Sequence, residues 1–452
     1  MEKSYRIIEE NQMTLFGTIR NKILSKNIEK RSFEYFQNIE DKKRLNFQLE
    51  KFNKHWQKII KIPYYSGLVK KGIVPNKFES WSEFVEKVPV TTKKVIQDNK
   101  NNMTDKSRKS EFTRITGGTT AQPVQLPSWN SEMKEAELDL WTARSWYEIN
   151  PKSRLFLIWG HSHLLGTGVS GKINGFKRKL KDKLLGYYRF SAYNINREKM
   201  RLAAEVMLKF QPDYVIGYSV ALDNFIRVNK DLIDKLGALK LKVVVGTAES
   251  FPKEDSESII NEIFNCPVGM EYGSAETNLV AHTHPDGGYK VFWQNYFVEA
   301  IDNGQQKGKI IRITSLYPRC FPLIRYEIGD EVELYDGDNG LGISRLKKVI
   351  GRCNLFALMP DGSKIHSEAF THCVRDVQGI NQYQILQEKD KIRLLLIVND
   401  KYIKENEKEI KSRLVKINKE FNNMNFEYVT SLKQTISGKT PMVIRKDNED
   451  SN

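Results

Sequence analysis

The ten residues RITGGTTAQP, 114–123, combine a flexible backbone with several small hydroxyl side chains. Glycine lets backbone N–H groups approach a phosphate closely, and threonine hydroxyls can donate hydrogen bonds to its oxygens. Thr116, Gly117, Gly118, Thr119 and Thr120 are therefore candidates for a polyphosphate-binding loop. The Lys-Ser/Thr pair of the nucleoside-triphosphatase P-loop is missing, which excludes that motif. On its own, a Gly-Thr segment is more often ordinary turn material.

Four other short motifs contain residues that suit a nucleotide site. They are Tyr272-Gly273-Ser274-Ala275-Glu276, Tyr326-Glu327-Ile328-Gly329-Asp330, Gly351-Arg352 and Ser437-Gly438-Lys439. Taken one at a time, the carboxylates are typical of turns and helix caps, and Ser-Gly-Lys is typical of an exposed turn. Taken together, in this order after the first segment, they are harder to explain as unrelated turns.

The spacing of apolar residues changes along the chain, and these changes predict the secondary-structure elements that would hold the motifs. Residues 1–105 are predicted to be helical, because apolar residues recur there at spacings of three and four. Residues 106–353 alternate short apolar runs with helical patterns and turn to strands after 290, which predicts an α/β and β core. Residues 354–452 predict a small α+β lobe. Loops at strand ends are the expected binding places.

The composition indicates a globular protein that works in a reducing compartment. Of 452 residues, 40% are hydrophobic, and the four cysteines are scattered without a CxxC pair. No apolar run suggests a membrane span or signal peptide, so we expect a cytoplasmic protein. The net charge of +16 is spread over the chain, and we expect no nucleic-acid partner.

The densest basic run is GKINGFKRKLKDKLLGYYR, 171–189. It suits a membrane surface or a polyanionic ligand, and it also suits a solvated lysine-rich helix. The first reading would bring the protein to the inner face of the membrane as a peripheral partner.

The order and spacing of the motifs resemble the acyl-adenylate-forming superfamily, and specifically its phenylacetate-CoA-ligase-like branch. The segment VPVTTKKVIQ (88–97) looks like that branch's entry segment, and TGGTTAQP looks like its phosphate loop with Ala121 in place of glycine. FQPDYVIGYSVAL (210–222) and AYNINREKM (192–200) resemble the capsular-polysaccharide-biosynthesis proteins within the branch. The resemblance covers nearly the whole chain and implies a large α/β N-terminal domain of the adenylate-forming type with a small mobile α+β C-terminal lobe.

The resemblance implies a role for each motif in binding ATP and Mg²⁺. Thr119 and Thr120 would hold the pyrophosphate portion, and Glu276 would hold Mg²⁺ on phosphate oxygens. Asp330 would accept hydrogen bonds from the ribose hydroxyls. The remaining nucleotide-binding positions implied are Thr116, Gly117, Gly118, Ala248, Glu249, Tyr272, Gly273, Ser274 and Arg352.

The same resemblance gives the C-terminal lobe two roles. Lys439 would donate to the reacting carboxylate and α-phosphate, where negative charge develops. Asn354 occupies the hinge position, where the family usually has Asp or Lys, and the lobe would rotate there between half-reactions. Ala275, like Ala121 and Asn354, departs from the usual pattern, and none of the three removes a charge that adenylation needs.

Histidines supply further candidates. His161 and His163 follow an apparent strand, and Tyr218 and Ser219 end another, so all four are candidates for a substrate pocket, with satisfied loop residues as the alternative for the histidines. The pair His282 and His284 could bind zinc together with Cys266 or Cys320, although a surface histidine pair is the commoner case.

These observations predict an ATP-dependent ligase that forms an acyl-AMP and passes the acyl group to an acceptor. The capsular resemblance favours an amine acceptor and amide formation in surface-polysaccharide assembly. The phenylacetate-CoA-ligase resemblance keeps an aryl-acid CoA ligase open, with coenzyme A as the thiol acceptor. A non-catalytic relative that binds an acyl group or a glycan is the alternative from another class.

Overall fold

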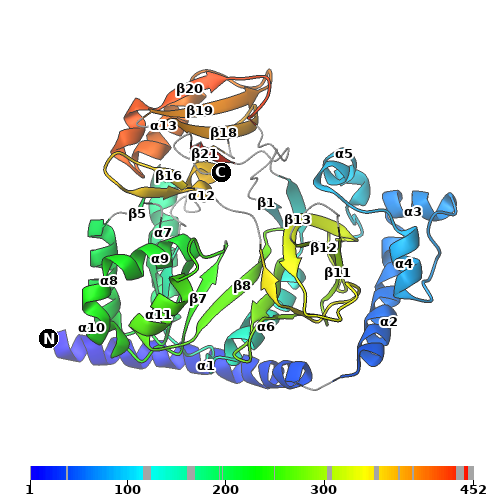
Figure 1. The fold of residues 1–452 in the computed structure, drawn as a ribbon, viewed down its shortest axis with the longest axis horizontal. Coiled ribbons are helices and arrows are strands. Elements are labelled where there is room, and N and C mark those ends of the chain that lie inside the picture. Colours follow the sequence, from blue (N-terminus) through cyan, green and yellow to red (C-terminus); the bar gives the residue numbers. More distant parts are fainter. Residues whose placement is uncertain are drawn as a thin grey trace.

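The computed structural model describes residues 2–36, 39–115, 124–159, 168–192, 194–195, 197–248, 250–302, 308–350, 356–374, 377–388, 391–433 and 442–445. It shows a large N-terminal domain with a smaller C-terminal lobe beside it (Figure 1). The expected large α/β domain and small α+β lobe are confirmed.

Five helices form the N-terminal segment, as predicted. They are α1 (Glu2–Phe36), α2 (Asp41–Ile59), α3 (Pro63–Lys70), α4 (Trp81–Lys87) and α5 (Lys93–Met103). Hydroxyl caps begin two of these helices: the Ser80 hydroxyl accepts from the Glu83 N–H at 3.1 Å at the start of α4, and the Thr92 hydroxyl caps α5 in the same way. Helix α1 runs along the base of the large domain (Figure 1).

The core of the large domain is an eight-stranded mixed sheet in the order β14-β10-β9-β8-β7-β6-β3-β4. Its parallel part is β4 (Tyr187–Phe190), β3 (Leu155–Ile158), β6 (Tyr214–Tyr218), β7 (Val243–Thr247) and β8 (Val268–Ser274). Its antiparallel part is β9 (Asn278–Thr283), β10 (Tyr289–Val291) and β14 (Arg345–Leu346). Every residue of β6 and β7 is buried, as expected of parallel strands covered on both faces.

Helices connect and cover these strands. They are α6 (Asn130–Ser145), α7 (Gly168–Leu184), α8 (Arg197–Phe210), α9 (Ser219–Val228), the 3₁₀ turn Lys230–Leu232, α10 (Ile233–Gly237) and α11 (Ser256–Phe264). Two smaller sheets complete the domain: the hairpin β1 (Phe112–Ile115) and β2 (Gln125–Ser128), and the sheet β11 (Tyr296–Ile301), β12 (Lys309–Ser315), β13 (Tyr326–Glu333) and β15 (Lys348–Val349).

The C-terminal lobe has its own sheet and its own core. Its four-stranded sheet, in the order β20-β19-β18-β21, uses β18 (Ile380–Glu388), β19 (Lys391–Val398), β20 (Asn425–Tyr428) and β21 (Val443–Arg445). The helices are α12 (Ser367–Val374) and α13 (Asn406–Val415), followed by the 3₁₀ turn Lys419–Asn423. These strands and helices form the small α+β lobe expected from the sequence.

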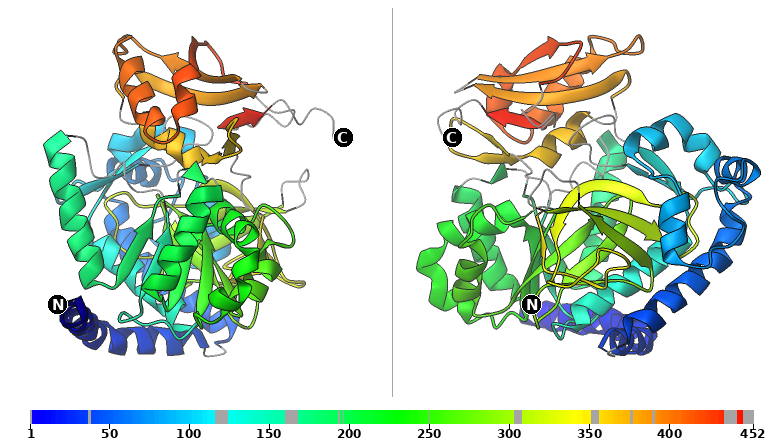
Figure 2. Two further views of the ribbon diagram at one scale, coloured as in Figure 1. Left: turned by 90° about the vertical axis from the view of Figure 1, so that its left-hand side faces the viewer. Right: turned by 45° about the vertical axis from the view of Figure 1, so that its right-hand side comes forward.

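A third small sheet joins the lobe to the large domain. The hairpin β16 (Phe356–Leu358) and β17 (Lys364–His366) pairs with β5 (Asn194–Ile195), which belongs to the large domain. Figure 2 shows the lobe seated over one end of the large domain. The boundary predicted at 353/354 lies outside the described residues.

Aromatic packing fastens the N-terminal helices to the second sheet. The Trp81 ring on α4 stacks on Phe297 of β11, with centroids 3.6 Å apart and planes 7° from parallel. The Trp81 indole N–H also donates to the Leu45 carbonyl at 3.0 Å. This contact joins segments more than two hundred residues apart in the chain.

We expect Trp81→Ala to lower the free energy of unfolding by about 3–5 kcal/mol, because it empties a buried aromatic site. The matched control is Ile73→Ala in the same helical segment, where the side chain is 42% exposed and the loss should stay near 0.5 kcal/mol. Urea unfolding followed by circular dichroism measures both. Equal losses would contradict the assigned role of Trp81.

Candidate active site

Several of the predicted site residues lie outside the described residues. They are Thr116, Gly117, Gly118, Thr119, Thr120, Ala121, His161, His163, Glu249, Arg352, Asn354 and Lys439. Their roles stay predictions. The described part of the site consists of the motifs around Tyr272, Glu276 and Asp330, together with the ends of β6 and β7.

The structure brings Tyr272 and Asp330 together. Tyr272 lies on β8 of the large sheet and Asp330 on β13 of the second sheet, and the Tyr272 hydroxyl donates to the Asp330 carboxylate at 3.2 Å. Tyr272 is buried, and Asp330 is partly exposed. Two motifs that are 58 residues apart in sequence thus share one hydrogen bond.

Glu276 lies on the turn after β8, and its side chain is buried. Its carboxylate accepts a hydrogen bond from the Tyr326 hydroxyl at 3.0 Å. Tyr326 begins β13, the same strand that carries Asp330. Glu276 and Asp330, the two predicted nucleotide-site carboxylates, are therefore both hydrogen-bonded across the junction of β8 with β13.

The turn that carries Glu276 is fixed by hydroxyls and by one buried arginine. The Ser274 N–H donates to the Thr277 hydroxyl at 3.0 Å, and the Thr277 N–H donates back to the Ser274 hydroxyl at 3.2 Å. The Arg319 guanidinium, 1% exposed, donates to the carbonyl oxygens of Glu276 and Thr277. The backbone that presents the Glu276 carboxylate is thus held from within the core.

A second buried arginine, Arg114, supports the same turn. It donates to the Ala275 carbonyl at 3.5 Å and to the Asn278 side-chain oxygen. Arg114 and Arg319 share the buried Glu132 carboxylate, at 3.4 and 3.7 Å respectively. Sequence reasoning missed Glu132 and Arg319, because their local sequence carries no signal. Arg114 could have been proposed from the sequence, because it lies two residues before Thr116, where the predicted phosphate loop begins.

The carboxyl ends of β6 and β7 meet beside this region. Tyr218 and Ser219 are fully buried at the end of β6, and the Ser219 hydroxyl lies 3.9 Å from the Met270 sulfur. A side chain at Gly246 would meet that sulfur at 2.5 Å, so glycine is required by close packing. Ala248 has φ +71°, the left-handed conformation that turns the chain at the end of β7.

The described residues hold no group of three His, Cys, Asp or Glu side chains suited to a metal, and the possible zinc ligands His282, His284, Cys266 and Cys320 form no such group there. His282 is fully buried, and its Nδ1 lies 2.8 Å from the Thr283 carbonyl oxygen. Burial lowers the pKa of His282 to about 4. His284 pairs with Asp286 at 3.1 Å. These contacts are consistent with a structural role for both histidines.

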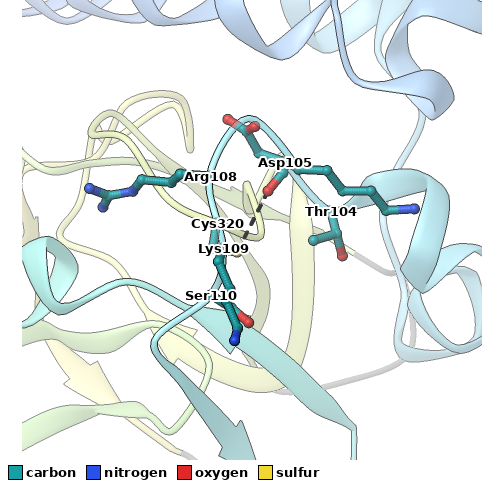
Figure 3. A pocket seen from close by; sticks show the side chains of 7 residues that line it. Thr104, Asp105, Arg108, Lys109, Ser110 and Cys320 are labelled. Carbon is teal, nitrogen blue, oxygen red and sulfur yellow. Dashed lines mark hydrogen bonds between the residues drawn. The ribbon is translucent and has the colours of Figure 1, made fainter.

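A basic pocket of about 360 Å³ lies beside the start of β1. Its lining residues are Thr104, Asp105, Lys106, Arg108, Lys109, Ser110 and Cys320 (Figure 3). The pocket connects to the site through Cys320, whose N–H donates to the Glu132 carboxylate at 3.0 Å. It therefore adjoins the buried support of the site and lies apart from the Tyr272–Asp330 pair.

Residues 358–446 match the family model of the CapK C-terminal domain. Protein CapK of Staphylococcus aureus is 24% identical to this chain over 464 residues, which cover 97% of each chain. The C-terminal lobe thus resembles the CapK C-terminal domain, and the whole chain resembles protein CapK. The match over the lobe and the full-length relative confirm the resemblance to the capsular-polysaccharide branch of the adenylate-forming enzymes.

Solved structures confirm the fold of the chain. It is similar to 2-hydroxyisobutyryl-CoA ligase in its thioesterification state, with a TM-score of 0.56, 16% identity and 91% of each chain covered. The same ligase in its postadenylation state gives a TM-score of 0.54 at 15% identity, covering 90% of this chain and 91% of the ligase.

No helix among the described residues could cross a membrane.

The low pKa of His282 predicts a pH-dependent stability. In the unfolded chain His282 takes up a proton near pH 6.5, whereas in the folded chain it does so only near pH 4. The free energy of unfolding therefore falls as the pH is lowered from 6.5 to 4. We expect His282→Gln to lose about 2 kcal/mol less of its unfolding free energy than the parent protein between pH 7.5 and pH 5. Urea unfolding at the two pH values measures this difference, and parallel pH profiles would contradict a neutral, buried His282.

Proposed function

We propose that this protein is an ATP-dependent ligase that activates a carboxylate as an acyl-AMP and transfers the acyl group to an acceptor. The single observation that carries the proposal is the hydrogen bond between Tyr272 and Asp330. It joins two motifs for which the family resemblance implies nucleotide binding, with Asp330 on the ribose, inside a fold shared with a CoA ligase solved in its postadenylation state.

The described residues fit an adenosine nucleotide. Asp330 is a partly exposed carboxylate with acceptor oxygens for ribose hydroxyls, and Tyr272 beside it offers an aromatic ring. Glu276 is a hard oxygen ligand of the kind that Mg²⁺ prefers, fixed by Tyr326 at 3.0 Å. A bound Mg²⁺ would neutralise negative charge on the phosphates. Thr119 and Thr120 would hold the pyrophosphate portion.

The proposed reaction has two half-reactions. In the first, a carboxylate oxygen of the substrate attacks the α-phosphorus of ATP, the bond to the β-phosphate breaks, and pyrophosphate leaves. Lys439 would donate to the carboxylate and the α-phosphate as charge develops there. In the second, an amine or thiol attacks the acyl carbon, loses its proton, and displaces AMP. Rotation of the C-terminal lobe about Asn354 would separate the two steps.

The resemblance to protein CapK favours an amine acceptor and a role in surface or capsular polysaccharide assembly. An amine acceptor would yield an amide, whereas coenzyme A would yield a thioester. Because ATP is the cosubstrate, we place the reaction in the cytoplasm.

The decisive experiment measures pyrophosphate release from ATP and Mg²⁺ with a panel of aryl, amino and sugar carboxylates, each with coenzyme A, an amino sugar or no acceptor. We expect release with at least one carboxylate, and faster turnover with an amine.

Asp330→Asn should raise the KM for ATP about tenfold, because an amide is a weaker acceptor for ribose hydroxyls. The matched control is Asp336→Asn at an exposed position a few residues on. If no carboxylate of the panel led to pyrophosphate release and the parent protein did not bind ATP, the proposed enzymatic activity would be contradicted and the non-catalytic alternative favoured.

Lys439→Ala should separate the half-reactions. We expect it to lower the rate of acyl-AMP formation by at least about a hundredfold, because the lysine stabilises charge only in the first transition state. Transfer from preformed acyl-AMP should stay within about twofold of the parent rate. Single-turnover assays of each step measure this split, and an equal loss in both would refute the assigned role.

A further inference from the structure

Helix α7 exposes an apolar stripe to solvent. Ile173, Phe176 and Leu180 are 49%, 70% and 50% exposed. At 100° per residue they fall within an arc of about 60° on one side of the helix. A surface helix normally buries its apolar side against the core, so this orientation needs a reason.

The opposite side of α7, which faces the protein, is polar. Asp182 is only 8% exposed and pairs with Arg189 of β4 at 2.7 Å. Arg178 and Gly175 share this inner side, and both are partly buried. The helix therefore docks through charged and small residues, and its apolar stripe plays no part in the core.

Lysines border the exposed stripe on both sides. By the same helical spacing, Lys177 and Lys181 lie on one border, and Lys179 and Lys183 lie on the other. All four are exposed. Lysine side chains are long enough to keep their ammonium groups at the level of anionic headgroups while neighbouring apolar side chains enter the acyl region.

A second stripe of the same kind lies on α1, which contacts α7. Phe16, Ile19 and Ile23 are 50%, 48% and 67% exposed and follow one another at spacings of three and four. Lys22 and Lys26 are exposed beside them. The Arg20 guanidinium donates to the Tyr187 hydroxyl at 2.9 Å, which fixes α1 to the strand after α7. In the left view of Figure 2, α7 stands at the outer edge of the molecule and α1 passes beneath it.

We propose that the stripe on α7, with the stripe on the neighbouring helix α1, binds the surface of a bilayer that contains anionic phospholipids. The apolar residues enter the interface, and the lysine borders pair with headgroup phosphates. Charge complementarity selects this partner: a nucleic acid would match the lysines but would leave three apolar side chains per helix without a function. This inference is independent of the proposed reaction.

Vesicle binding tests the proposal with the full chain. We expect the protein to sediment with vesicles of phosphatidylcholine that contain one third phosphatidylglycerol, and to bind pure phosphatidylcholine at least about tenfold more weakly. The double variant F176S/L180S should bind anionic vesicles at least about tenfold more weakly than the parent. The matched control is Ile403→Ser in the C-terminal lobe, an apolar residue that is 57% exposed away from both stripes, and it should bind as the parent does.

Other results would overturn the proposal. Equal binding of F176S/L180S and the parent, equal binding to neutral and anionic vesicles, or no binding to either would each do so. Light scattering after size-exclusion chromatography provides the remaining arm. If the parent is a dimer and F176S/L180S is a monomer, the stripe joins two copies of the chain and the bilayer assignment is wrong. Circular dichroism confirms that the variants are folded.

Discussion

The candidate site depends on the ion pairs that the buried Glu132 carboxylate forms with Arg114 and Arg319. The carboxylate lies between the two arginines, and both reach past it to the backbone of the turn at 275–278. A buried charge is tolerated only when it is paired, so these three residues must be placed together or not at all. Their correct placement also fixes the turn that presents Glu276.

This cluster lies where three parts of the large domain meet. Glu132 is in the first turn of α6, where it also accepts from the N–H groups of Trp129 and Cys320. Arg114 belongs to the hairpin strand that leads into the predicted phosphate loop. The hydrogen bonds from Tyr272 and Tyr326 then connect the large sheet to the second sheet. The proposed nucleotide site is thus a junction of the large sheet, the second sheet and the β1–β2 hairpin.

The C-terminal lobe and the basic helix add two features at the periphery of this junction. The lobe has a core of its own and pairs with the large domain through β5, which suits a part that the resemblance expects to rotate. Helix α7 is bound through Asp182 and leaves its apolar stripe outside. The first feature concerns the reaction, and the second concerns where the protein is held.

The sequence alone determined the order of elements, because apolar spacing differs between helices and strands, and the motifs around Tyr272 and Asp330 carried the family resemblance. It could not identify Glu132 and Arg319 as partners, because ion pairs between residues 187 positions apart leave no local pattern. The basic run at 171–189 was visible in sequence, but three readings of it stayed open. Only the tertiary structure decided which side of α7 faces solvent, because the partly buried ion pair of Asp182 with Arg189 turns the polar side of the helix toward the protein.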